Sequence, residues 1–209
     1  MITLADARTR SDRSQDLLLT VVTARAGDRT SELVQDLERA DPCLLRHGVA
    51  VARLALLMAP RLGLADDCFE TLCRAALLHD VGKRFVPREV LGKCGALIAH
   101  ERQLVEAHAC VGASMLVAAG LLSEASIVRH HHERWDGAGY PDRLHGDAIP
   151  LESRIILAAD SFDAMTSDRA YRAAMPQAAA LSEIERAAGS QLDPACVAAL
   201  CEVAFRSAA

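Results

Sequence analysis

The sequence has 209 residues, of which 51% are hydrophobic, and a formal net charge of −5. A chain of this length and composition forms one domain, with or without a short appendage, and global disorder is excluded. The acidic balance argues against a general nucleic-acid binder, which would normally be basic, so we expect neither DNA nor RNA as a partner.

Residues 1–38 are expected to form an N-terminal segment with one or two helices, ahead of a main domain over residues 39–209. Residues 17–37 have a helical pattern that Gly27 weakens, so they form one kinked helix or two short ones. Two interpretations stay open. The stretch either mediates a homodimer or contact with a regulatory protein, or it caps the core.

Clear helix boundaries follow. Asp41-Pro42 is a strong helix start, and the helix after it carries apolar residues at 45, 49, 52 and 56 and ends at Gly63. Asp66 or Asp67 is expected to cap the next helix, which runs to His79-Asp80.

Beyond Gly82 and Pro87 the pattern breaks, leaving a short helical piece near residues 88–91. Further helices are predicted over about 99–119, from a Ser123 cap towards residues 130–132, and over about 151–166. An irregular loop over 135–150, rich in Gly, Pro and Asp, lies between the last two. Pro176 and Asp193-Pro194 open two final helices. No segment has convincing strand periodicity, so the sequence predicts an all-α fold.

The seven cysteines form no CxxC pair, and their number is odd, so neither a zinc ribbon nor a disulfide scaffold is indicated. The first residues lack the apolar core of a signal peptide. No run approaches the roughly 20 uninterrupted apolar residues of a spanning helix. We therefore expect reduced cysteines, a cytoplasmic protein and no membrane association.

Imidazoles and carboxylates recur along the predicted helices. Any one of them alone is more often a packing or surface residue than a ligand. As a set they come from five helical segments that can converge in the core of a bundle, and seven ligands fit two metal ions about 3.5–4 Å apart. Ligands of this kind, without thiolate, suit Fe, Mn, Ni or Zn. The set is His47, His79, Asp80, His108, His131, His132 and Asp160.

Four longer motifs contain most of these residues. They read HDVGK at 79–83, HERQLVEAH at 100–108, HHERWDGAGYP at 131–141 and RIILAADSFDAMTSDRAYR at 154–172. With His47 they span about residues 40–205, and this ordered set resembles the HD-GYP family, the phosphodiesterase branch of the HD-domain superfamily. The resemblance implies an all-α, HD-domain-like bundle with a metal site at its centre.

The resemblance also implies two divalent metal ions, with Fe or Mn favoured and Ni or Zn as alternatives. Asp80 is shared between them. Two adjacent histidines on a regular helix point about 100° apart, so the helix end must distort for both His131 and His132 to reach one ion. The implied ligands are His47, His79, Asp80 and Asp160 for one ion, and Asp80, His108, His131 and His132 for the other.

Two further roles follow from the resemblance. Lys83 is implied to bind the scissile phosphate and help protonate the leaving oxygen, which makes it catalytic together with the bridging Asp80. Asp163 either contacts a guanine edge or orients Lys83. The residues implied to bind substrate are Tyr140, Asp163, Arg169 and Arg172.

Other positions are expected to support the site or stay outside it. Glu133 and Asp136 are better candidates for orienting ligands than for binding metal. His130 is interpreted as a surface or supporting residue, and His100 and His145 as surface residues. Cys43 replaces a glutamate that can recruit a third metal in some family members, so two metals are expected here.

The implied activity is hydrolysis of cyclic di-GMP to linear pGpG, and further to GMP, by attack of a metal-bridging hydroxide. Two alternatives stay open. The domain could be a receptor that binds a cyclic dinucleotide with little or no turnover. It could also be an HD phosphohydrolase for another nucleotide, such as a hybrid cyclic dinucleotide.

Overall fold

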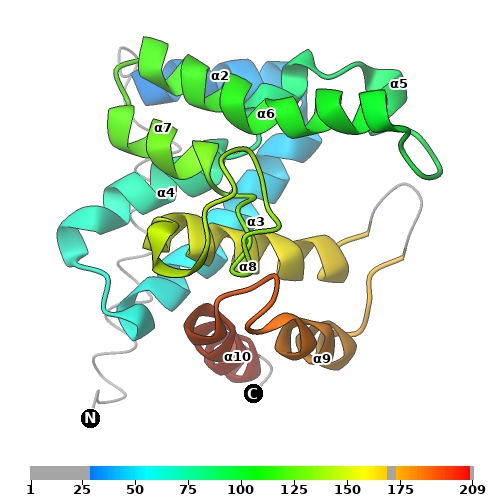
Figure 1. Cartoon of the computed structure of the whole chain (residues 1–209). Helices are drawn as coiled ribbons and strands as arrows, with labels where there is room; N and C mark the ends of the chain where they lie inside the picture. Colours follow the sequence, from blue (N-terminus) through cyan, green and yellow to red (C-terminus); the bar gives the residue numbers. More distant parts are fainter. Residues whose placement is uncertain (1–28, 169–172, 208–209) are drawn as a thin grey trace.

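The structure is a computed structural model that describes residues 29–168 and 173–207. These residues form helices joined by turns, and the one β-type pairing among them is an isolated bridge between Ala188 and Leu192. The predicted all-α fold is confirmed for the described part of the chain (Figure 1). The helical stretch expected from residue 17 lies outside the described residues as far as residue 28.

The elements follow one another along the chain, with short 3-10 helices (η) between longer α-helices. In order they are α2 (Arg29–Ala40), α3 (Pro42–Met58), η1 (Ala59–Leu62), η2 (Asp66–Cys68), α4 (Phe69–Leu78), η3 (Val81–Phe85), α5 (Arg88–Leu91), α6 (Ala99–Ala118), α7 (Leu122–Arg129), η4 (Gly146–Ala148), α8 (Leu151–Thr166), α9 (Gln177–Ala187) and α10 (Pro194–Ser207).

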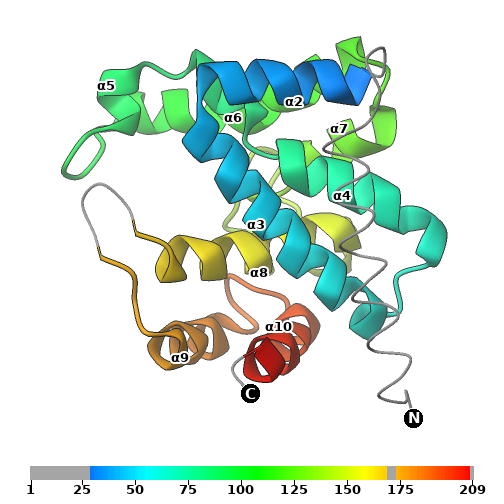
Figure 2. The same ribbon diagram turned by 180° about the vertical axis from the view of Figure 1, so that it is seen from behind.

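Helix α3 is the centre of the bundle. It packs against α2, α4, α8 and α10, and Figure 2 shows it running diagonally between these helices. Its start is fixed as predicted, because Asp41 Oδ1 accepts the N–H groups of Cys43 and Leu44 and Pro42 stands at the first helical position. By length and composition, α3 together with η1 could cross a membrane. In this structure its apolar side chains contribute to the hydrophobic core.

Two predicted helix starts are wrong. Asp66 and Asp67 lie in the 3-10 turn η2, and α4 begins only at Phe69, with no side-chain cap. Helix α7 begins one residue before Ser123, with Leu121 at the N-cap position. The upstream turn displaces the start in opposite directions, because Asp66 and Asp67 lie ahead of the N-cap of α4 and Ser123 lies inside the first turn of α7.

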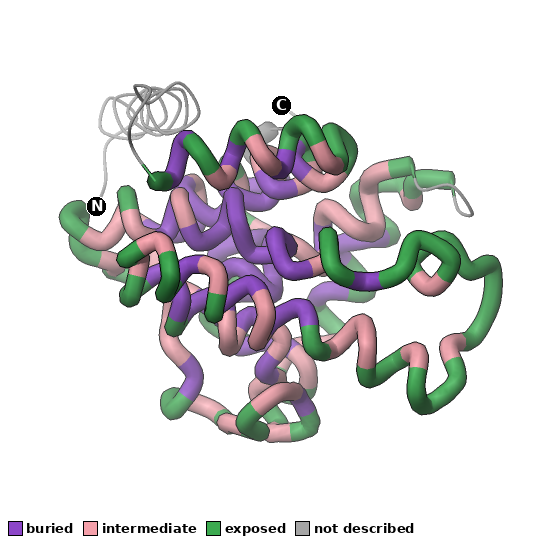
Figure 3. The backbone as a smooth tube through the Cα atoms, turned by 90° about the horizontal axis from the view of Figure 1, so that it is seen from above, coloured by how far each residue is buried: buried purple, intermediate pink, exposed green. Residues whose placement is uncertain are grey.

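Helix α2 covers one side of α3. Its residues Val34 and Leu37 are almost completely buried, and Figure 3 shows the buried backbone forming one continuous interior. The packing of residues 29–40 is that of a helix capping the core.

Two glycines allow backbones to meet at the centre. A Cβ on Gly48 would lie 2.4 Å from the Leu77 carbonyl oxygen, and one on Gly82 would lie 2.1 Å from that of His108. Only a residue without a side chain fits at either crossing. The first crossing brings α3 against α4, and the second brings η3 against α6.

Candidate metal centre

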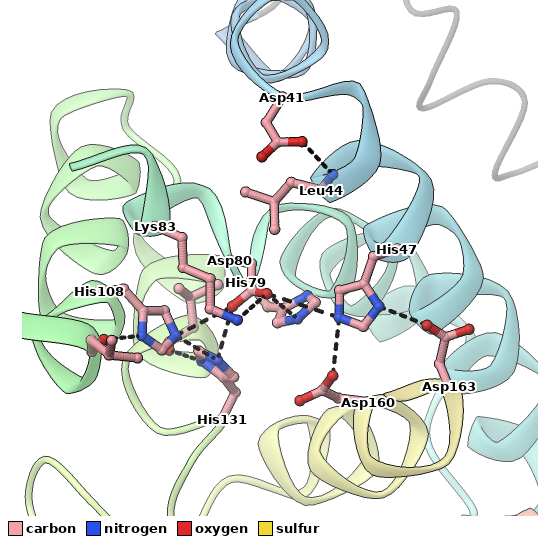
Figure 4. A network of polar contacts seen from close by, with 12 residues as sticks. Asp41, Leu44, His47, His79, Asp80, Lys83, His108, His131, Asp160 and Asp163 are labelled. Carbon is pink, nitrogen blue, oxygen red and sulfur yellow. Dashed lines mark hydrogen bonds and ion pairs between the residues drawn. The ribbon is translucent and has the colours of Figure 1, made fainter. Parts of the chain in front are cut away.

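Six of the seven predicted ligands fall into two groups at the centre of the bundle, and Asp80 belongs to both. Within each group the ligand atoms lie within 4.8 Å of one another. Asp160 joins them from α8, where its Oδ1 lies 3.0 Å from His47 Nε2. Figure 4 shows side chains converging from α3, the end of α4, α6, the turn after α7 and α8, namely His47, His79, Asp80, His108, His131 and Asp160. The groups are His47, His79 and Asp80, and Asp80, His108, His131 and His132.

The two oxygens of Asp80 face different imidazoles. Oδ2 lies 3.4 Å from His79 Nε2 and 3.9 Å from His47 Nε2. Oδ1 lies 3.3 Å from His108 Nε2 and 4.0 Å from His131 Nε2. A carboxylate arranged in this way can bridge two cations, one on each side.

Three of the histidines are oriented by their own helical turns. The Nδ1 atoms of His79, His108 and His131 lie 2.5–2.7 Å from the carbonyl oxygen of the residue three positions earlier. A carbonyl only accepts, so each Nδ1 carries the proton and each Nε2 presents a lone pair to the centre. Metal-binding histidines are commonly held in this way by a backbone carbonyl.

The atoms at the centre fit a metal. His79 Nε2 and Asp80 Oδ1 are buried without a hydrogen-bond partner. The Nε2 atoms of His108 and His131 face each other at 3.3 Å, although the tautomers above make both of them acceptors. Converging lone pairs without donors are costly in a buried site unless a cation lies among them.

Burial and charge set the ionisation of these groups. Burial lowers the pKa of His132 to about 3, and it lowers the pKa of His131 well below its usual range. Both rings are therefore neutral at pH 7, as metal ligands must be. Burial raises the pKa of Asp80, but Lys83, with its Nζ 2.6 Å from Oδ2, and the imidazoles outweigh it, so the pKa lies well below normal.

His47 is held between two carboxylates of α8. Its Nε2 faces Asp160, and its Nδ1 lies 2.7 Å from Asp163 Oδ2. Burial lowers the pKa of His47, but the bonds to these two aspartates outweigh it and raise the value to about 9. Asp163 therefore lies against His47, a contact that the sequence analysis did not predict, and it lines the same cavity as Lys83.

Helix α7 ends before the adjacent histidines, as the predicted distortion requires. Its last residue is Arg129, and His131 and His132 lie in the turn that follows. Their ring centroids are 4.1 Å apart. The Tyr140 ring lies 4.9 Å from that of His132, so Tyr140 packs against a predicted ligand. Burial raises the pKa of the Tyr140 hydroxyl, which stays protonated at neutral pH.

The loop that carries Tyr140 is anchored by charged residues. Asp142 accepts two hydrogen bonds from the Arg129 guanidinium and lies 2.9 Å from His130 Nε2, and its N–H donates to Glu133 Oε1. Asp136 pairs with Arg134.

None of His130, Glu133 and Asp136 belongs to the two ligand groups. His100 and His145 are exposed.

A cavity of about 650 Å³ opens onto the centre beside α3. Lys83, Asp80, His47 and Asp163 line it, together with Cys43 and Arg46. Cys43 Sγ accepts a hydrogen bond from Arg46 and belongs to neither ligand group. The sequence analysis did not single out Arg46. Its position next to His47 was the available signal, but only the fold places it at the cavity.

Arg169 and Arg172, predicted to bind substrate, lie outside the described residues.

A family model described as HD domain matches residues 28–196. This chain belongs to the HD-domain family. The resemblance to HD-GYP proteins is confirmed by the curated relatives of this HD domain. One relative is the cyclic di-GMP phosphodiesterase response regulator RpfG of Xanthomonas campestris pv. campestris. This chain is 38% identical to it over 182 residues, which cover 86% of this chain and 48% of the relative.

A second relative is the 3'3'-cGAMP-specific phosphodiesterase 3 of Vibrio cholerae, which is 41% identical over 160 residues, covering 76% of this chain and 35% of the relative. The HD domain thus spans half or less of the length of these curated relatives. Among solved structures, an HDGYP protein of Bdellovibrio bacteriovorus, Bd1817, has the same fold, with a TM-score of 0.67 and 19% identity over 96% of this chain and 64% of that one.

Proposed function

We propose that this HD domain is a metal-dependent phosphodiesterase that hydrolyses a cyclic dinucleotide, with cyclic di-GMP as the favoured substrate and linear pGpG, and then GMP, as products. The observation that carries the proposal is the division of the two Asp80 oxygens between two groups of imidazoles. The names of the relatives, which are phosphodiesterases for cyclic di-GMP or 3'3'-cGAMP, support it.

We propose two divalent ions, Fe or Mn in preference to Ni or Zn. Such ions supply a nucleophilic water at neutral pH and neutralise charge on the phosphate. The ligand atoms of the two groups are nitrogen and oxygen, which suits these metals. His47, His79, Asp80 and Asp160 would hold one ion, and Asp80, His108, His131 and His132 the other.

The remaining residues of the site bind and orient. Lys83 Nζ lies at the cavity, where it can bind a phosphate oxygen and donate a proton to the leaving oxygen. Asp163 accepts from His47 Nδ1 and fixes that ring with Nε2 towards the centre. Tyr140 holds His132 from the loop side.

We further propose that the catalytic unit comprises residues 39–209 and works in the cytoplasm. A homodimer or a regulatory partner through the N-terminal segment remains a proposal. The burial of Val34 and Leu37 supports the simpler role of a core cap for residues 29–40.

The test is a substrate panel. Protein purified without oxygen is analysed for metal, loaded with Mn²⁺ or Fe²⁺, and assayed with cyclic di-GMP, 3'3'-cGAMP and cyclic di-AMP. We expect turnover of cyclic di-GMP, and loss of both metal and turnover in a folded Asp80→Ala variant. Preference for 3'3'-cGAMP would assign the hybrid dinucleotide instead. Tight binding without turnover would indicate a receptor, and no binding would refute the proposal.

A further inference from the structure

The cavity beside α3 is lined by two cationic side chains besides His47 among residues 29–168 and 173–207, and these are Lys83 and Arg46. Lys83 is already engaged with Asp80, at 2.6 Å. For the Arg46 guanidinium the structure gives one polar contact, a hydrogen bond of 3.0 Å from Nη2 to the Cys43 thiol. A thiol is a weak acceptor, so the described residues leave most of the hydrogen-bonding capacity of Arg46 unused.

The carboxylates of the same cavity are engaged elsewhere. Asp41 caps α3, Asp163 contacts His47 and Ser167, and Asp168 accepts the N–H of Ala174. None of them pairs with Arg46. Because these carboxylates have other partners, the Arg46 guanidinium can accept an anion from outside.

The contact with Cys43 also positions Arg46. Cys43 lies one helical turn before Arg46 on α3, and both line the cavity. The first N–H groups of α3 are occupied by the Asp41 carboxylate, so the helix terminus itself is not the anion site. In Figure 4 the start of α3, marked by Asp41 and Leu44, lies on the side of the centre from which Lys83 reaches Asp80.

We propose that Arg46 binds the phosphodiester of the substrate that is not being cleaved. This inference rests on the proposed function. A cyclic dinucleotide carries two phosphodiesters. Lys83 and the ligand groups serve the scissile one, and among the described residues that line the cavity Arg46 is the other cation with hydrogen-bond donors to offer the second. The planar guanidinium suits two parallel hydrogen bonds to phosphate oxygens.

The test compares two substrates in Arg46→Ala, Arg46→Lys and a matched control, Arg53→Ala. Arg53 is exposed on the same helix but does not line the cavity. For cyclic di-GMP we expect kcat/KM of Arg46→Ala to fall about 10-fold or more, mainly through KM, because a contact made equally in ground and transition states changes KM. The kcat/KM of Arg46→Lys should lie between those of Arg46→Ala and the wild type, and the kcat/KM of Arg53→Ala should equal that of the wild type.

The second substrate is bis(p-nitrophenyl) phosphate, which has a single phosphodiester. Its turnover and the bound metal should be unchanged in Arg46→Ala. Equal losses for both substrates, or no loss for either, would overturn the inference. If the wild-type protein binds cyclic di-GMP without cleaving it, the proposed hydrolase function is wrong but the role of Arg46 can still be tested. In that case calorimetry should give a higher Kd for Arg46→Ala than for the wild type, and an equal Kd would overturn the inference. If the wild type neither binds nor cleaves it, both proposals fail.

Discussion

Replacing Gly82 by alanine tests the close packing that brings η3 against α6. The new Cβ would lie 2.1 Å from the His108 carbonyl oxygen and 2.7 Å from the Gly112 nitrogen, whereas ordinary contacts begin near 3.4 Å. Both neighbours are backbone atoms of α6, so no side chain can move aside. The two segments must separate by more than an ångström.

That separation has two measurable costs. Overpacking of this kind destabilises a protein by about 1–3 kcal/mol. At about 2–4 °C per kcal/mol for a domain of this size, the melting temperature should fall by several degrees. Asp80 lies two residues before Gly82 and Lys83 directly after it, and the new Cβ clashes with the backbone of His108, so the centre is distorted too. A misplacement of about 1 Å can lower the rate roughly 10²-fold.

The assay is urea denaturation together with metal content and kcat/KM for cyclic di-GMP. Gly95→Ala is the matched control, because a Cβ there meets nothing within 4 Å. We expect Gly82→Ala to lose stability, metal and activity while Gly95→Ala keeps all three. If the two variants behave alike, the packing argument is wrong.

Three further predictions concern charged side chains. Lys83→Ala should retain its metal in elemental analysis while kcat falls about 10²–10³-fold, and a metal-free variant would contradict the role given to Lys83. Asp163→Asn should weaken metal affinity about 10–100-fold in chelator competition, because Asp163 orients His47; a change in KM alone would favour the substrate contact expected from the sequence. Hydrogen bonds from Arg129 lower the pKa of Asp142 to about 2, so its contribution to stability is present above about pH 4 and is lost as the pH falls through 2. In urea denaturation Asp142→Asn should cost on the order of 1 kcal/mol at pH 7, after allowance for solvent screening, and almost nothing near pH 2, whereas an equal cost at both would refute the ion pair.

Much of the fold could be predicted because local chemistry decides it. The start of α3 follows from Asp41-Pro42, and the spans of α5 and α8 from the residues that flank them. The starts of α4 and α7 could not be predicted in the same way. A polar residue such as Ser123 can stand before a helix or inside its first turn, and the preceding turn decides which.

The candidate site shows the same limit at longer range. The set of seven imidazoles and carboxylates was evident from the sequence, and the structure brings its members together. The partner of Asp163 was not evident. Its spacing of three from Asp160 predicts the same helix face, but which residue meets that face depends on how α3 crosses α8. The cavity position of Arg46 depends on the same crossing.

The carbonyl contacts of His79, His108 and His131 bear on how such a site can persist while its surroundings change. Each ring takes its direction from a peptide group three residues upstream in the same segment. A peptide oxygen is present whatever side chain occupies that position. Substitutions at Ala76, Val105 or Val128 therefore leave the acceptor in place. The orientation of each ring can be kept while the sequence around it changes, as long as the local helical turn is preserved.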